Sequence, residues 1–430
     1  MASGAPGQKA FVRLSWNWVV DSAGPKSAVD RLLDIVPSFG GWLRAMFLPV
    51  GYPASVHPVY AKVHIYQFLE TFVWSAVSVL CSQAMLASIG IGSTAAAAGT
   101  AVAVQWVLKD GIGEIGKLFF IQRFARSFDS HPKTWKFVGE VSSLTGAFMQ
   151  LCTVVSPSSW FLPLASAGYA LRSIHYSIWG ATHMTFTRNF ALQGNVGDLV
   201  AKDDSQMSVA HLAGMLWGVG AITISHSPAY LFTGFLLLTP IHFFMTLSLL
   251  RAAQFEVLNH TNLTLICRQY VADQTIPGMN DLKRHERWFG EWLAKGEQVV
   301  RIDVGATANK AFDDASVLST AIRVLKTENY LLSTPNSPNE PVHICLHTSA
   351  AAHDVIKAML HATRFHHELA GSPTKVAKNC ALTPLESSHQ WTLNHFPRFI
   401  AELDERDWQS DAVFWGDGGR RVEWKRGEGK

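Results

Sequence analysis

Long apolar stretches separated by short polar ones dominate the first half of the chain. A membrane-spanning helix needs about 20 mostly apolar residues, and the last of the six stretches meets this length best. The second is short and Ala-rich, and the third contains Glu140 and Gln150. The pattern predicts a bundle of six membrane-type helices, with a large soluble helical core as the alternative. The six stretches are 72–92, 94–108, 139–155, 158–175, 208–226 and 228–250.

The same pattern divides the chain into four parts. Residues 1–47 form an amphipathic lead-in, because apolar residues recur at helical spacing from Val29 to Val36. The helical membrane domain occupies 48–255, and a helical linker follows at 256–295. The remainder, 296–430, is predicted to be a soluble α+β domain. The fold class is therefore mainly α, a membrane-type bundle followed by a small α+β domain.

In the C-terminal domain, short runs of alternating apolar and polar residues are interspersed with runs whose apolar residues recur at helical spacing. The order strand, helix, strand, strand, helix is that of a ferredoxin-like fold. A glycine-turned hairpin at 414–424 could complete the sheet. The predicted strands are 298–304, 328–333 and 342–347, and the predicted helices are 314–326, 350–369 and 386–403.

The distribution of charged residues supports this division. Charged residues make up 16% of the chain, against about 25% in average soluble domains, and they are sparse in the helical half. Lysine and arginine gather in two polar intervals that we interpret as loops between the helices, 109–136 and 172–202. If all six helices span, the positive-inside rule puts both termini on the cytosolic or organelle-interior side of an intracellular membrane. A net charge of +3 is too small to indicate nucleic acid as a partner.

Motifs that would indicate an enzyme are weak. Gly111, Gly113 and Gly116 form a G-x-G-x-x-G pattern, but a helical run precedes it where a dinucleotide site needs a strand. Close helix packing explains these glycines better. The spacing of the histidines and of the five cysteines predicts neither a metal site nor a disulfide framework. We expect no catalytic, cofactor-binding or metal-binding residues, and therefore no enzymatic activity.

Polar residues at the ends of the apolar stretches are the candidate functional cluster. Charged groups there are costly, so they pair with each other or line a pathway; alternatively, they lie in ordinary interfacial loops and reach water. The densest set falls within Gly194–Gln206. The candidate residues are Lys109, Asp110, Asp198, Lys202, Asp203 and Gln206.

Several of these segments resemble the root UVB sensitive family. The resemblance covers roughly residues 40–250 and extends more loosely to two segments of the C-terminal domain, Glu328–Leu332 and Asp354–Ala358. The matching segments are Leu48–Val56, Tyr66–Gln67, Gly90–Gly92, Trp106–Gly113, Lys133–Lys136, Gly180–Thr182, Asn195–Asp198 and Ala201–Gln206.

The chain also departs from the family pattern. Leu69-Glu70 stands where the family usually has Trp-Asp, and so keeps the acid but loses the aromatic ring. His183 replaces a usual Arg, Asn189 a usual His, and Asp204 a usual Gly. The sequence is thus similar to a divergent member.

The resemblance implies a membrane-associated protein, often of intracellular organelles, with no established catalytic activity. It also implies a link to ultraviolet-B sensitivity and vitamin B6 homeostasis, and an oligomer with itself or with a family paralogue. We expect a non-enzymatic membrane protein of small-molecule transport or homeostasis. The alternative is a membrane-associated scaffold whose C-terminal domain recruits a partner. Deleting 270–430 would separate the two, because a carrier keeps some flux and a scaffold loses its function.

Overall fold

The computed structural model describes residues 39–90, 99–253, 257–279, 281–282, 302–334, 340–370, 382–415 and 420–424. The chain forms two compact units, Met1–Leu48 and Pro49–Lys430. In the first unit, the helix α2 (Phe39–Phe47) is described. The helical face expected between Val29 and Val36 lies outside the described residues.

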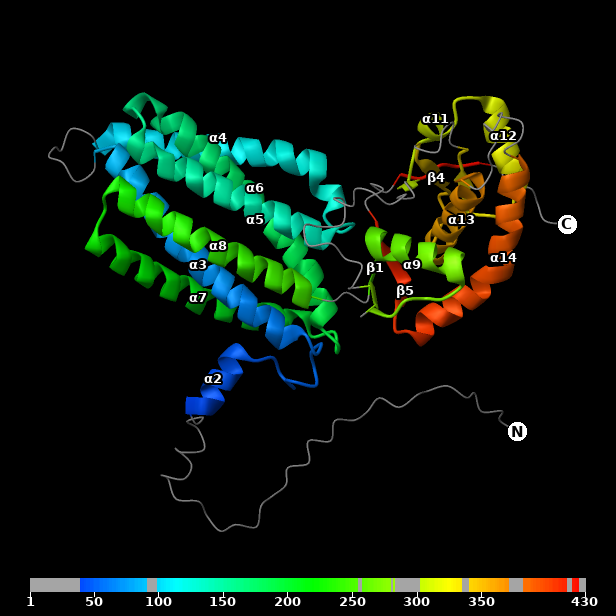
Figure 1. Cartoon of the computed structure of the whole chain (residues 1–430), viewed down its shortest axis with the longest axis horizontal. Coiled ribbons are helices and arrows are strands. Elements are labelled where there is room, and N and C mark those ends of the chain that lie inside the picture. Colours follow the sequence, from blue (N-terminus) through cyan, green and yellow to red (C-terminus); the bar gives the residue numbers. More distant parts are fainter. Residues whose placement is uncertain are drawn as a thin grey trace, which may run out of the picture. The chain divides into compact units, whose positions relative to one another are not determined.

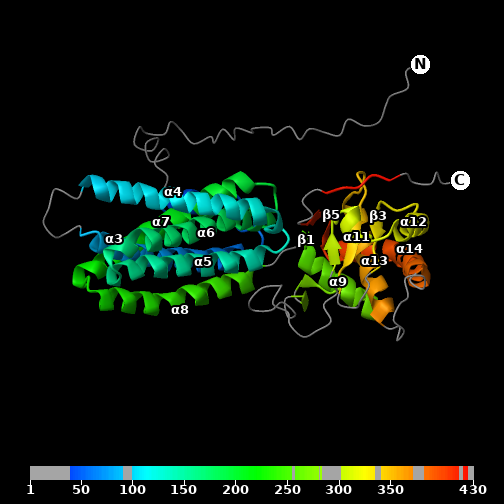
Figure 2. The ribbon, with the colours of Figure 1, turned by 90° about the horizontal axis from the view of Figure 1, so that it is seen from above.

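In the described part of the second unit, six long helices come first and lie side by side as one bundle (Figures 1 and 2). α6 packs on α4 and α5, and α3 packs on α5, α7 and α8. Prolines open two of the helices at positions where no backbone N–H is needed. The helices are α3 (Tyr60–Ser88), α4 (Gly99–Phe124), α5 (Pro132–Cys152), α6 (Phe161–Phe190), α7 (Val196–Ile224) and α8 (Pro228–Ala252).

Each predicted apolar stretch corresponds to one of these helices, but the polar intervals were wrongly taken as loops. Residues 109–124 continue α4, and 172–190 continue α6, so many of the basic residues counted as loop charges lie on helices. Among the described residues, four helices are long and apolar enough to cross a membrane: α3, α7, α8 and the segment Pro132–Val155, which contains α5. The charges at the end of α4 and within α6 lower their hydropathy.

Glycines allow the close helix packing that the sequence predicts. A Cβ added at Gly113 would lie 2.2 Å from the ring of Tyr169 on α6. Gly146 of α5 and Gly168 of α6 face each other, and a Cβ on either would approach the carbonyl oxygen of the other within 2.6 Å. The helix-packing interpretation of the Gly111–Gly116 pattern is therefore confirmed at Gly113.

The C-terminal part has its own core of helices on small sheets. α13 packs on α9 and α14 and on the strands β3 and β4, and Asn259 caps α9 by accepting a hydrogen bond from the Asn262 backbone N–H at 2.9 Å. The elements are β1 (Val257–Asn259), α9 (His260–Asp273), β2 (Ile302–Val304), α11 (Ala308–Ala311), α12 (Ala315–Val324), β3 (Tyr330–Leu332), β4 (Val342–Leu346), α13 (Ala352–Ala370), α14 (Leu382–Glu405) and β5 (Gln409–Phe414).

The three predicted strands form a three-stranded sheet in the order β2-β4-β3, with β2 parallel and β3 antiparallel to β4. The turn of the predicted hairpin, 416–419, lies outside the described residues; β5, which overlaps its start, pairs with β1 in a separate parallel sheet, and Val422 makes a single bridge to His347. A ferredoxin-like fold thus stays a prediction. Residues of β1 and α9, in the segment expected as a linker, belong to the same core.

Candidate functional site

A network of charged side chains lies inside the helical bundle, where α3 and α5 meet. Lys136 of α5 is at its centre. Its Nζ donates to Glu70 Oε2 of α3 at 2.9 Å and to Glu140, one turn further along α5. All three residues are at most 6% exposed. Because a buried charge is costly unless it is paired and hydrogen-bonded, each of these groups depends on the others.

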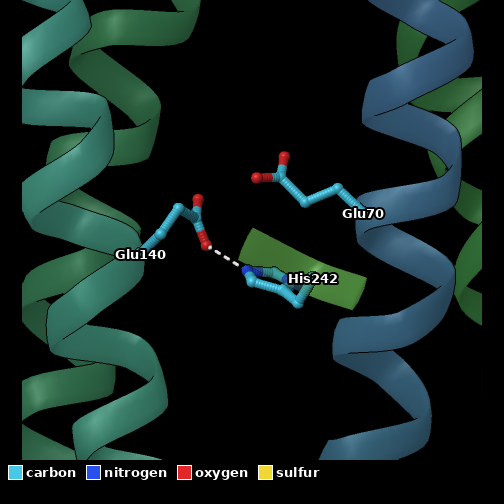
Figure 3. Close-up of side chains that lie close together, drawn as sticks. All are labelled: Glu70, Glu140 and His242. Carbon is cyan, nitrogen blue, oxygen red and sulfur yellow. Dashed lines mark hydrogen bonds and ion pairs between the residues drawn. The ribbon is translucent and has the colours of Figure 1, made fainter. Parts of the chain in front are cut away.

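Helix α8 adds His242 and Thr246, both fully buried. His242 Nε2 donates to Glu140 Oε2 at 2.9 Å, and the Thr246 hydroxyl donates to Glu70. Figure 3 shows Glu70, Glu140 and His242 converging from three helices. His175 of α6 contributes a second imidazole, whose Nδ1 lies 3.6 Å from Glu140. Four helices therefore supply one polar centre.

The same centre has donor atoms that suit a metal ion. One ligand atom each from Glu70, Glu140 and His242 lies within 4.8 Å of the others, and carboxylate and imidazole groups bind divalent metals. The Lys136 ammonium, however, already contacts both carboxylates and supplies the positive charge. The arrangement matches an internal ion-pair network better than a metal centre.

A second buried network surrounds Asp203 of α7, which is 2% exposed. His183 Nε2 lies 2.9 Å from Asp203 Oδ2, and Gln67 donates to its Oδ1 at 3.3 Å. Both ring nitrogens of His64 face acceptors, the Asp203 carboxylate at 3.2 Å and the Tyr60 carbonyl at 2.9 Å. The Asp203 carboxylate thus has three polar neighbours, two on α3 and one on α6.

A cavity of about 300 Å³ opens against the Lys136 network. Its inner wall holds the charged centre, and its outer wall includes the exposed residues Tyr176, Asp204 and Ser208. A narrow second pocket also touches Lys136 and Trp179 and reaches His183 of the Asp203 network. The cavity is lined by Glu70, Thr71, Trp74, Lys136, Glu140, His175, Tyr176, Trp179, Asp204, Met207, Ser208, His211 and His242.

Two of the residues predicted from the sequence form a local pair on α4. Lys109 is 3% exposed and contacts the carboxylate of Asp110. Its ammonium also lies 4.7 Å from the ring centre of Trp106 and 4.4 Å from that of Tyr169. The carboxylate and the two aromatic faces compensate the buried ammonium. The described contacts of Lys109 all lie on α4 and α6.

The other four predicted residues lie on α7. Asp198 accepts a hydrogen bond from the Val50 backbone N–H at 2.7 Å and lies 3.7 Å from Lys202. Gln206 lies beside the Tyr60 hydroxyl, near the Asp203 network. The cavity described above includes Asp204 from this motif and none of the six predicted residues.

The Lys136 network was not predicted from the sequence. Its members are spread from α3 to α8, and no spacing along the chain connects them. Glu70 and Glu140 each interrupt an apolar helix, which was the sequence signal for this network. Glu140 was instead interpreted as evidence against a membrane span. An isolated charge in an apolar helix indicates a buried partner on another helix.

The described structure defines a class of protein: a six-helix bundle with a polar, ionisable interior, followed by a helical domain with small sheets. The chain belongs to the root UVB sensitive family. Residues 37–274 match the family domain described as "Vitamin B6 photo-protection and homoeostasis domain", and residues 292–424 match "Root UVB sensitive protein, C-terminal". The resemblance found in the sequence is thereby confirmed, and the family-level role is vitamin B6 photo-protection and homoeostasis.

Three relatives illustrate how far this chain has diverged. Protein root UVB sensitive 5 of Arabidopsis thaliana is 26% identical over 85% of this chain and 73% of its own length. Protein root UVB sensitive 2, chloroplastic, of the same plant is 27% identical over 87% and 83%. RUS family member 1 of Dictyostelium discoideum is 29% identical over 60% of this chain, which spans half of that relative. No solved structure matches the chain.

Proposed function

We propose that the bundle is embedded in an intracellular membrane and that the cavity beside Lys136 is the solute-binding site of a non-enzymatic carrier. The observation that carries the proposal is a buried network of charges inside a bundle whose outer surface is apolar. Glu70, Lys136, Glu140 and His242 are buried, whereas large apolar side chains cover the outside. In water the reverse distribution is favoured.

The outward apolar side chains support the membrane part of this proposal. In α7, only 17% of the most apolar window is buried inside the protein, so lipid contact would remove the rest from water. Exposed apolar residues occur along α4, α7 and α8: Val104, Val107, Leu108, Ile112, Ile115, Leu118, Phe119, Val209, Leu212, Leu216, Trp217, Val219, Ile224, Leu236, Leu237, Ile241 and Phe244.

The cavity supports the carrier part. Its volume of about 300 Å³ lies at the lower end of the range for small-molecule sites, roughly 300–1,000 Å³. Ionisable residues inside membrane helices commonly mark substrate or ion pathways. A vitamin-sized solute fits this volume, in keeping with the family's role in vitamin B6 homoeostasis.

Carbonate extraction tests the membrane part, and uptake by reconstituted vesicles tests the carrier part. We expect the protein to stay in the membrane pellet, with tags at both ends cleaved from one side. Vesicles holding the purified full chain should accumulate a vitamin B6 compound faster than empty vesicles, and Lys136→Met should abolish the difference. Release of the protein by carbonate, or equal uptake by empty vesicles for every B6 compound, would overturn the proposal.

A further inference from the structure

The charges that face the cavity do not balance. Glu70 and Glu140 contribute two carboxylates, and Lys136 contributes one ammonium that contacts both. In the buried wall the two carboxylates thus outnumber the one lysine ammonium. Asp204 adds another carboxylate at the exposed rim. Arg172 lies outside the lining and bonds Gln150 and Ser78, with its guanidinium carbon 5.0 Å from the centre of the Trp74 ring.

Aromatic rings form much of the remaining wall. Trp74 and Tyr176 pack edge to face with their centres 5.6 Å apart, and Trp179 follows Tyr176 by three residues on α6. Aromatic faces attract cations and stack on flat rings. An anion such as a phosphate ester would instead require free cationic donors. Lys136 is the single lysine or arginine in this lining, and it is committed to two carboxylates.

We propose that this cavity selects small organic cations that carry an aromatic ring and an amine, and that it discriminates against their phosphate esters. The inference rests on the proposed carrier function. The surplus carboxylate would pair with the ammonium of the ligand and accept its N–H groups, and the aromatic wall would hold its ring.

Competition binding on the purified full chain in lipid nanodiscs tests this. The probe is radiolabelled pyridoxamine, and the competitors are pyridoxamine, pyridoxine, which has no amine, and pyridoxamine 5′-phosphate. We expect pyridoxamine to compete at least tenfold better than its phosphate ester and better than pyridoxine. Equal or stronger competition by the phosphate ester, or no binding of the amine, would overturn the inference.

Variants connect the selectivity to the cavity. Glu70→Gln removes the surplus negative charge and should weaken amine binding at least tenfold, whereas Glu70→Asp, which keeps the acid, should retain it. If Glu70→Gln does not fold, Asp204→Asn at the exposed rim provides a second test, and we expect it to weaken amine binding several-fold. Glu114→Gln, on the half-exposed carboxylate that pairs with Lys117, is the control. Amine binding that survives both charge-removing variants would overturn the proposed recognition.

Vesicle uptake separates this inference from the carrier function. If vesicles holding the full chain take up the phosphate ester faster than empty ones, the carrier function is supported and the proposed cation selectivity is wrong. If the vesicles take up none of the three compounds faster than empty ones, the carrier function itself fails.

Discussion

Lys136 places one ammonium between two buried carboxylates, so its removal leaves Glu70 and Glu140 with like charges and no cation. Breaking a buried pair in this way typically costs about 3–5 kcal/mol. We expect Lys136→Met to lower the thermal stability of the full chain strongly in detergent or nanodiscs. Lys117→Met, whose ion pair with Glu114 is partly exposed, should cost less than about 1 kcal/mol. Equal stability of the two variants would contradict the buried network.

His183, one of the departures from the family pattern noted in the sequence, lies against Asp203, and a guanidinium can hydrogen-bond the same carboxylate. We expect His183→Arg to fold and to keep uptake within about threefold of the parent chain. His183→Ala should lose stability by about 1–3 kcal/mol, since the buried carboxylate loses a charge-assisted hydrogen bond. Thermal unfolding and vesicle uptake of the two variants provide the comparison; a worse result for the arginine variant would exclude a simple pairing role.

At the scale of elements, close approach of α5 and α6 depends on two facing glycines. A Cβ at Gly168 would lie 2.6 Å from the Gly146 carbonyl oxygen, so the helices must move apart in Gly168→Ala. Overpacking of this kind typically costs about 1–3 kcal/mol.

Gly180, on the same helix, has nothing within 4 Å of an added Cβ. Gly180→Ala should therefore be neutral or stabilise by up to about 1 kcal/mol, because alanine favours the helix. Thermal unfolding of both variants measures the difference. A loss of stability at Gly180 as large as that at Gly168 would show that helix spacing is not the cause.

At the scale of the whole molecule, the C-terminal domain should lose stability in acid. Burial lowers the pKa of His361 to about 3, and its ring lies between the Tyr330 hydroxyl and the Ser388 hydroxyl. Hydrogen bonds from His389 and Lys357 also hold the pKa of Glu328 below its usual value. Both folded-state pKa values are depressed, so the stability they confer is present at pH 7 and is lost as the pH falls.

For His361 the loss begins near its unfolded pKa of about 6.5 and amounts to about 2 kcal/mol between pH 7 and pH 5. Hydrogen exchange in α13 and α14 of the full chain, corrected for intrinsic rates, measures it. His361→Gln should remove most of this pH dependence, whereas His353→Gln, at an exposed position on α13, should leave it unchanged. An unchanged pH dependence in the His361 variant would assign the effect to other groups.

The sequence by itself determined the family, the helical first half and most elements of the C-terminal domain. Hydrophobic periodicity and family motifs are local along the chain, so a single sequence carries them. The acid at Glu70 and the motif around Asp203 could also be recognised in the sequence, but their partners on other helices could not.

Only the tertiary structure decided which charges meet. Glu70, Lys136, Glu140 and His242 lie on three helices, far apart in the chain, and packing alone brings them to one buried point. The pairing of β5 with β1 and not with β4 was decided in the same way. Ion pairing and strand pairing depend on distance in space, and sequence spacing does not specify that distance once the residues lie on different elements.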